Sequence, residues 1–129
     1  MIMLDTHILL WILSDQDQLS EKAREMIDKQ KRCISIASFW EISIKTSLKD
    51  PKRRLVLGMT LDELEEQCGK SEIEILPITT ADCKRASVLE HIHDDPFDRI
   101  IIAQAIERGL PLVTRDQKIW QYAAVEKVW

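Results

Sequence analysis

The sequence predicts an α/β fold in which a mainly parallel sheet forms the central layer of a three-layer α/β/α sandwich. Two observations predict it. Short apolar runs of strand length alternate along the chain with longer segments of helical period. These runs are rich in Ile, Val and Leu, which is typical of strands buried on both faces. Strands that alternate with helices form βαβ units, and such units build a parallel sheet covered by helices.

Five segments have the length and composition expected of these strands. Each contains β-branched or leucine residues and is bounded by polar or turn-forming residues. The predicted strands are MIML (1–4), CISI (33–36), IEIL (73–76), LVT (112–114) and VEKVW (125–129).

The segments between the strands carry start and stop signals of helices. Predicted helix-capping residues at the N-terminus are Ser20, Thr60 and Thr79. Asp95 followed by Pro96 is a favourable helix start, with the aspartate as cap and the proline at the first helical position. Gly109 is expected to end that helix. The least regular segment, 50–59, is expected to be a loop that joins two helices.

The length and composition are those of a single globular domain, which we expect to span residues 1–129. The chain has 129 residues, of which 45% are hydrophobic, enough to bury a core without disulfides. No apolar run is long enough to cross a bilayer, and the N-terminus lacks a signal-peptide layout, so we expect a cytoplasmic protein without membrane contact. The three widely spaced cysteines are expected to be reduced and buried.

The net charge of −4 argues against a protein that passively coats nucleic acid, but not against a nuclease, whose active-site carboxylates add negative charge. Positive charge is concentrated around the irregular segment. The cluster comprises Lys45, Lys49, Lys52, Arg53 and Arg54. Both a solvated surface and a phosphate-contacting patch fit this pattern, and the solvated surface is the default interpretation.

Two aspartates follow predicted strands at one edge of the sheet. Asp5 follows the first strand, and Asp116 lies two residues beyond Thr114, at the end of the fourth. Ligands of open parallel sheets bind at the carboxyl ends of the strands. Each aspartate alone is explained equally well as a helix cap, because aspartate is a favoured residue there.

Asp98 is harder to explain by local structure. Ile101, Ile102 and Ala105 lie three, four and seven residues further on, so Asp98 shares the apolar face of its helix. A carboxylate that faces the sheet is costly unless a partner compensates it, and a divalent cation would be such a partner. A role in binding the first-turn amides is the alternative. Asp95 is explained as the cap, and Asp94 as a solvated loop residue.

Glu41 is equally ambiguous. In SFWE, Ser38 and Glu41 have the spacing of a capping box, and Lys45 lies at the favourable spacing for a helical ion pair. Glu41 nevertheless shares its face with Ile44 and Leu48. Four acids that converge would repel one another unless cations bind them, and carboxylates select Mg²⁺ or Mn²⁺ over zinc.

Histidine and aromatic residues give weaker signals. HIHDD (91–95) resembles the start of a metallo-hydrolase motif, but Pro96 stands in place of its last histidine, so a zinc site is not expected. His91 and His93 are expected to be loop residues, and His7 a residue at a helix start. The aromatic side chains on apolar helical segments are expected to be core rather than base-stacking residues. These are Trp11, Trp40, Phe97 and Trp120.

Four segments in order resemble the PIN-domain ribonucleases, and among them the VapC-type toxins of toxin–antitoxin pairs. The segments are MLDTHILLW, SFWEISIK, DPFDRIIIAQA and LVTRD. The resemblance implies a PIN-like α/β/α sandwich with an acidic pocket that binds Mg²⁺ or Mn²⁺. By this resemblance the catalytic acids are Asp5, Glu41, Asp98 and Asp116, with Asp5, Asp98 and Asp116 as metal ligands. Thr6 and Thr114 match supporting positions.

The resemblance further implies hydrolysis of RNA phosphodiester bonds, with Glu41 holding a second ion or orienting the attacking water. It implies a cognate antitoxin and a homodimer as well. Single-stranded or looped RNA is the expected substrate, because its backbone can enter a pocket that a stiff duplex cannot. Candidate phosphate contacts are Lys45, Lys49, Arg53, Arg54 and Arg115.

Two other functions fit the same fold class. A PIN-like scaffold could bind RNA or protein without catalysis, although the complete acid set argues against it. A receiver-like phosphoacceptor domain would need an aspartate at the end of the middle strand. IEIL is instead followed by PITT, which supplies none.

Overall fold

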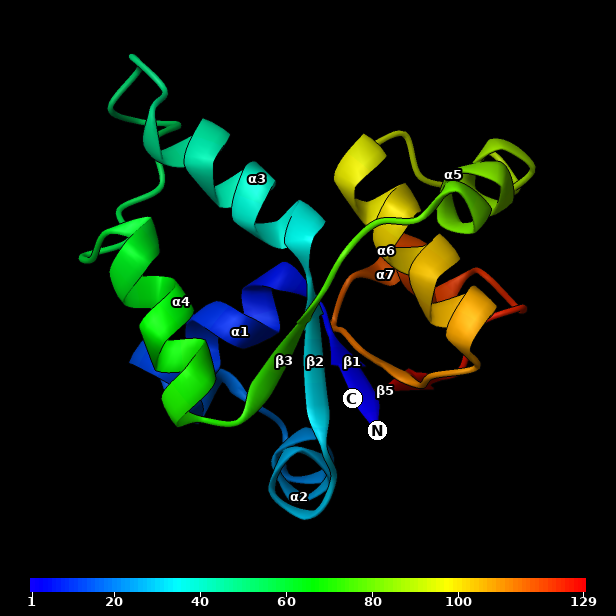
Figure 1. Ribbon diagram of the computed structural model, residues 1–129, viewed down its shortest axis with the longest axis horizontal. Helices are drawn as coiled ribbons and strands as arrows, with labels where there is room; N and C mark the ends of the chain where they lie inside the picture. Colours follow the sequence, from blue (N-terminus) through cyan, green and yellow to red (C-terminus); the bar gives the residue numbers. More distant parts are fainter.

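Five short parallel strands form the centre of the computed structural model, which describes residues 1–129 (Figure 1). The strands are β1 (Ile2–Leu4), β2 (Arg32–Ser35), β3 (Ile73–Leu76), β4 (Leu112–Val113) and β5 (Lys127–Val128). Their order across the sheet is β3-β2-β1-β4-β5, and every neighbouring pair is parallel. All five predicted strands are confirmed. Only β3 has the predicted bounds, and the ends of the other four strands differ from the predicted ones by one or two residues.

Seven α-helices and one 3-10 helix connect the strands. They are α1 (Thr6–Ser14), the 3-10 helix η1 (Gln16–Gln18), α2 (Glu21–Lys29), α3 (Ile36–Thr46), α4 (Leu61–Lys70), α5 (Thr80–Ser87), α6 (Pro96–Arg108) and α7 (Gln117–Trp120). The predicted caps Ser20, Thr60, Thr79 and Asp95 each accept a hydrogen bond from a backbone amide of the following helix. Gly109 ends α6 in the left-handed conformation, at φ 60°. None of the helices has both the length and the apolar character needed to span a membrane.

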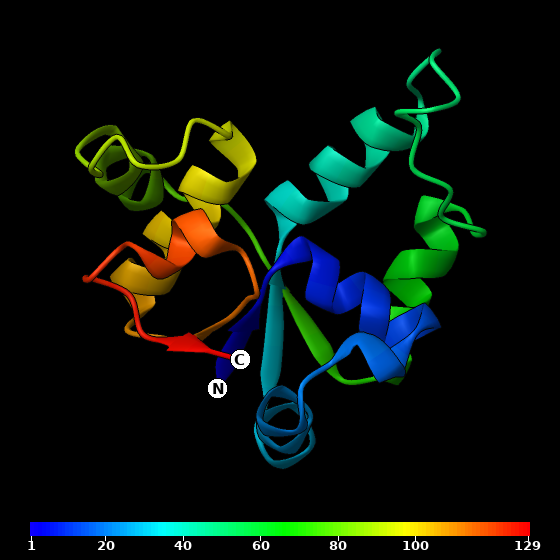
Figure 2. The ribbon, with the colours of Figure 1, turned by 180° about the vertical axis from the view of Figure 1, so that it is seen from behind.

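Helices cover both faces of the sheet, as expected of a three-layer α/β/α sandwich (Figures 1 and 2). An apolar cluster of buried side chains lies on each face. Side chains alternate along β1, so that Ile2 and Leu4 join one cluster and Met3 joins the other. Helices α1, α2, α3 and α4 contribute to the first cluster, and α6 and α7 contribute to the second. Helix α3 continues from the end of β2 and contacts α6 beyond the sheet.

The order of the strands places a ligand crevice at one edge of the sheet. The chain proceeds from β1 through β2 to β3 on one side, and then returns to add β4 and β5 on the other side of β1. In a doubly wound sheet, ligands bind at the carboxyl ends of the strands where the order reverses. Here that point lies between β1 and β4, directly before Asp5 and Asp116.

Three predictions about individual residues are wrong. The capping box at Ser38 and Glu41 does not form, because α3 begins at Ile36 and Ser35 is its cap. Trp40 is 62% exposed and Trp120 is 43% exposed, so neither is a core residue. Cys83 is exposed, whereas Cys33 and Cys68 are buried as predicted. For both tryptophans and for Cys83, the sequence left open which side of each helix would be covered.

Candidate active site

Asp5 lies at the end of β1 and is 2% exposed. Its Oδ1 atom accepts the Thr6 amide at 2.8 Å, so it caps α1. Its Oδ2 atom accepts the hydroxyl of Thr114 at 2.7 Å. The Thr6 hydroxyl bonds in turn to the Ser38 hydroxyl of α3, at 2.8 Å. These contacts hold Asp5 rigidly between two strands and two helices.

Asp116 follows β4 and caps the short helix α7 through the amides of Lys118 and Ile119. Its own amide donates to the Thr114 hydroxyl at 3.0 Å, while that hydroxyl donates to Asp5. Thr114 therefore joins the first and the last acid of the set. Partial burial opposes ionisation of Asp116, but hydrogen bonds from Ile119, Lys118 and His93 outweigh it and lower the pKa of this carboxyl.

Asp98 lies in the first turn of α6 and is 8% exposed, as its apolar face predicts. Asp95 supplies the cap by accepting the amides of Phe97 and Asp98, so Asp98 is free of that task. Burial raises the pKa of Asp98 to about 8, together with the negative charges of Asp5, Asp95, Glu41 and Asp116. A carboxyl in this setting ionises at neutral pH only when positive charge is brought to it.

Glu41 lies on α3 and is 3% exposed, although Ile44 on the same expected face is 41% exposed. Its Oε2 atom accepts Lys45 Nζ at 2.5 Å, the helical ion pair that the sequence predicts. Its buried Oε1 atom has no hydrogen-bond partner. An unpartnered carboxylate oxygen in a protein interior is costly, and it is accounted for if the site takes up a cation.

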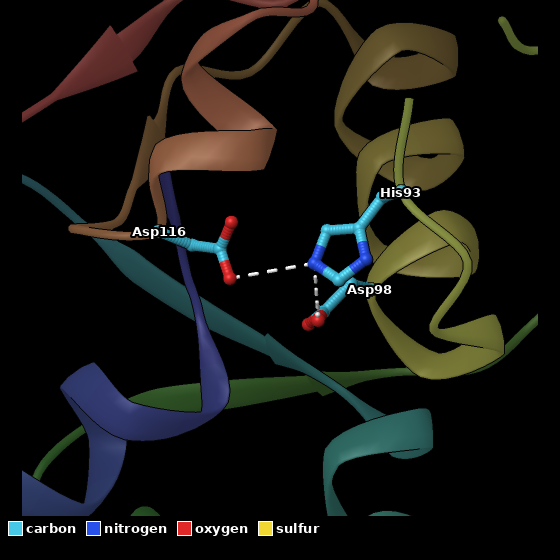
Figure 3. Close-up of side chains that lie close together, drawn as sticks. All are labelled: His93, Asp98 and Asp116. Carbon is cyan, nitrogen blue, oxygen red and sulfur yellow. Dashed lines mark hydrogen bonds and ion pairs between the residues drawn. The ribbon is translucent and has the colours of Figure 1, made fainter. Parts of the chain in front are cut away.

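His93 belongs to the site although the sequence indicates only a loop residue. Its side chain is buried, and Nε2 lies 2.9 Å from Asp98 Oδ2 and 3.3 Å from Asp116 Oδ2 (Figure 3). The three side chains are close enough to offer one ligand atom each to a single ion. One signal was available in the sequence: His93 lies two residues before the cap Asp95, close enough to bond to that residue's amide.

The predicted RNA-contacting residues fall into different settings. Lys45 is paired with Glu41, and Arg54 donates to the carbonyls of Leu48 and Lys49. The remaining three, Lys49, Arg53 and Arg115, are exposed. Arg115 lies over the ring of Trp11 at 5.7 Å. Together with Asp5, His7, Trp11 and Asp116, Arg115 lines an open hollow of about 350 Å³ beside the acids.

The site fits a hard divalent cation. Asp5, Glu41, Asp98 and Asp116 offer carboxylate oxygens, the ligands that Mg²⁺ and Mn²⁺ prefer. Glu41 has an unpartnered buried oxygen and Asp98 a carboxyl surrounded by negative charge. Lys45 alone among the nearby lysines and arginines forms an ion pair with one of these four acids. One lysine leaves most of the negative charge uncompensated.

Comparison with known proteins agrees with this geometry. The PIN domain family matches residues 2–125, which include all four acids. The chain belongs to the PIN domain family. The predicted resemblance is thereby confirmed. Within this PIN domain, the acids of the site come from the ends of β1 and β4 and from the helices α3 and α6.

This PIN domain is similar in sequence to a curated ribonuclease and similar in fold to proteins of toxin–antitoxin complexes. The chain is 26% identical over 120 residues to ribonuclease VapC22 of Mycobacterium tuberculosis, covering 92% of this chain and 88% of that protein. Its fold is similar to that of DNA-bound VapBC from Salmonella typhimurium, with a TM-score of 0.67, 21% identity and 98% and 97% of the two chains covered. It is also similar to a toxin–antitoxin complex from Klebsiella pneumoniae, with a TM-score of 0.63, 20% identity and 97% and 95% covered. These similarities confirm the predicted α/β fold.

Proposed function

We propose that this PIN domain is a divalent-cation-dependent endoribonuclease that acts as the toxin of a toxin–antitoxin pair. The observation that carries the proposal is the buried acid cluster. The negative charges of Asp5, Glu41 and Asp116 all act on Asp98, and Glu41 keeps an unpartnered oxygen within the protein. Burying such a cluster of acids costs free energy of folding, and a bound cation would compensate this cost.

Each acid has a role that follows from its position. Asp5, Asp98 and Asp116 hold Mg²⁺ or Mn²⁺, and Thr114 orients two of them. A bound divalent ion supplies Lewis acidity and lowers the pKa of water, which is the chemistry that phosphodiester hydrolysis requires. Glu41 has a free Oε1 with which to orient and deprotonate the attacking water, while Lys45 fixes its other oxygen. No side-chain nucleophile is required.

The substrate we propose is single-stranded or looped RNA. Lys49, Arg53 and Arg115 are exposed and would contact its phosphates. The similarity to a protein named ribonuclease supports RNA as the substrate. The similarity to VapBC and toxin–antitoxin complexes supports a cognate antitoxin as a partner. A homodimer, a cytoplasmic location and one domain over residues 1–129 complete the proposal.

The deciding experiment is RNA cleavage by purified protein free of antitoxin. Looped RNAs are incubated with Mg²⁺, with Mn²⁺ or with EDTA, and the products are separated on a denaturing gel. We expect cleavage with either ion and none with EDTA. Cation binding without cleavage of any RNA would instead support the alternative of a non-catalytic scaffold.

Replacing Thr114 with valine is expected to weaken Mn²⁺ binding by about tenfold or more, because partners that orient metal ligands contribute about 10- to 100-fold to affinity. The hydroxyl of Thr114 is completely buried and bonds to both Asp5 and the Asp116 amide. Valine preserves the shape but leaves both partners unsatisfied. Titration calorimetry measures the change, and Thr46→Val, which removes a hydroxyl that bonds within α3, is the control. Equal affinity of Thr114→Val and wild type would contradict the role of Thr114.

Replacing Lys49 and Arg53 together with alanine is expected to reduce the dependence of RNA affinity on salt. Removal of one lysine or arginine that binds a phosphate lowers the slope of log K against log salt by about 0.7 for a single strand. Fluorescence anisotropy with labelled RNA at several salt concentrations measures this slope in the Asp98→Asn background, in which we expect little cleavage. Lys22→Ala with Lys31→Ala is the control of equal charge, because Lys22 lies on α2 and Lys31 follows it, both are exposed, and α2 lies at the opposite end of the sheet (Figure 1). A slope unchanged from the parent would exclude both residues from the RNA interface.

A further inference from the structure

We propose that His93 is a positioning residue that holds Asp98 and Asp116 together and competes with the divalent cation for their oxygens. Its side chain enters the acid cluster from the loop before α6 (Figure 3). His93 is 7% exposed, so its imidazole is packed within the protein interior. The inference rests on the proposed cation site and adds to it a residue outside the four acids.

The hydrogen bond on the far side of the ring determines what Nε2 can do. The Asp95 amide donates to His93 Nδ1 at 3.2 Å, so Nδ1 is an acceptor and the neutral ring carries its proton on Nε2. Nε2 donates this proton toward Asp116 Oδ2 at 3.3 Å and lies 2.9 Å from Asp98 Oδ2. A protonated ring nitrogen has no lone pair for a metal ion. In this arrangement His93 is a donor to Asp116, in close contact with Asp98, and not a cation ligand.

Two other side chains fix the loop that carries His93. The Tyr122 hydroxyl accepts the His93 amide at 2.9 Å and donates to the Glu90 carbonyl at 2.8 Å. The guanidinium of Arg99 donates to the carbonyls of Glu90 and His93, at 3.0 and 3.2 Å. Arg99 lies on α6 one residue after Asp98, so the same helix positions both the acid and the imidazole. These hydrogen bonds fix the position of the loop and therefore of the imidazole.

The consequence is a competition for the same two oxygens. A cation held by Asp98 and Asp116 needs the oxygens that Nε2 contacts, and its positive charge repels the proton on Nε2. His93 must therefore give up these contacts, or move its proton to Nδ1 at the expense of the Asp95 bond. Either change costs free energy that is subtracted from cation binding. Removing Nε2 is thus expected to strengthen cation binding, whereas removing a ligand would weaken it.

The test is Mn²⁺ binding measured by titration calorimetry. His93→Asn keeps a polar atom at the depth of Nδ1 and removes Nε2, and we expect it to bind Mn²⁺ about fivefold or more tightly than wild type, the equivalent of roughly 1 kcal/mol. His93→Gln retains an N–H donor at a similar reach and is expected to return the affinity toward wild type. His91→Asn, an exposed histidine two residues away, is the control.

Thermal unfolding provides a second measurement that does not depend on activity. In EDTA, His93→Asn is expected to have a Tm about 3–6 °C below wild type, because the acids lose a donor. Saturating Mn²⁺ is expected to close this gap. Equal or weaker Mn²⁺ binding by His93→Asn, or a Tm difference that Mn²⁺ leaves unchanged, would refute the proposed role of His93. Neither outcome would refute the cation site. If wild type bound no Mn²⁺, the proposed cation site itself would be refuted.

Discussion

Replacing Asp98 with asparagine is expected to lower RNA cleavage by roughly a hundredfold or more while the fold is preserved. Asparagine has the same shape, so α6 and its cap at Asp95 are retained. It lacks the negative charge that would hold a divalent ion opposite Asp5 and Asp116. The measurement is the initial rate of cleavage in Mn²⁺, with circular dichroism as the check on the fold.

Asp94→Asn is the matched control for that experiment, because Asp94 is an exposed acid in the loop directly before α6. Its cleavage rate is expected to equal that of wild type. If Asp98→Asn and wild type cleave at the same rate and give the same products, the activity comes from a contaminant and the proposed nuclease is refuted.

Asp98→Asn is also expected to stabilise the protein in EDTA, and the stabilisation is expected to be larger at high pH. Burial and the surrounding acids raise the pKa of Asp98 from 3.8 to about 8. The folded protein therefore keeps a proton that the unfolded chain loses, and its stability falls as the pH rises from about 4 to about 8. Asparagine does not ionise and avoids this loss. The Tm difference between Asp98→Asn and wild type should be larger at pH 8.5 than at pH 5, and an equal difference would contradict the raised pKa.

The second large effect is expected at Asp82, a buried acid remote from the active site. Replacing it with asparagine is expected to lower the free energy of unfolding by about 3 kcal/mol, because breaking a buried ion pair leaves a charge without its partner. Asp82 is 1% exposed. Its carboxylate accepts hydrogen bonds from both terminal nitrogens of Arg108, at 2.7 and 3.1 Å. It also accepts the Thr79 amide in the capping box that starts α5. This estimate is at the lower end of the usual range because Arg108 is partly exposed.

Urea unfolding at pH 7 measures the loss. Glu107→Gln is the control, because it breaks the surface pair between Glu107 and Arg85, for which less than about 1 kcal/mol is expected. Burial opposes ionisation of Asp82, but Arg108 and Thr79 outweigh it and lower its pKa. Its contribution to stability is thus present at neutral pH and is lost as the pH falls through that lowered pKa. If Asp82→Asn and Glu107→Gln lowered the free energy of unfolding by the same small amount, the buried pair of Asp82 and Arg108 would not be what joins α5 to α6.

Asp82 and Asp98 show why burial alone does not identify a functional acid. Both are buried, and each lies in the first turn of its helix. Arg108 compensates Asp82, so nothing further is required there. Asp98 is surrounded by other acids, and its pKa moves in the opposite direction. The difference lies in the partners that tertiary structure provides, and only the second setting calls for a cation.

The sequence by itself determined the elements and much of the site. Strands, helix caps and the end of α6 at Gly109 depend on neighbours within one or two turns, and the structure confirms them. The same local periodicity placed Asp98 on the buried face of α6. The positions of Asp5 and Asp116 after their strands were also predictable, because parallel strands bring their carboxyl ends to one edge.

Only the tertiary structure decided which groups meet. The hydroxyl of Thr114 reaches Asp5, 109 residues away in the chain, because β1 and β4 are neighbours in the sheet. His93 enters the acid cluster because Tyr122 and Arg99 bind its loop. Such contacts depend on how separate elements pack, and no spacing along the chain encodes them.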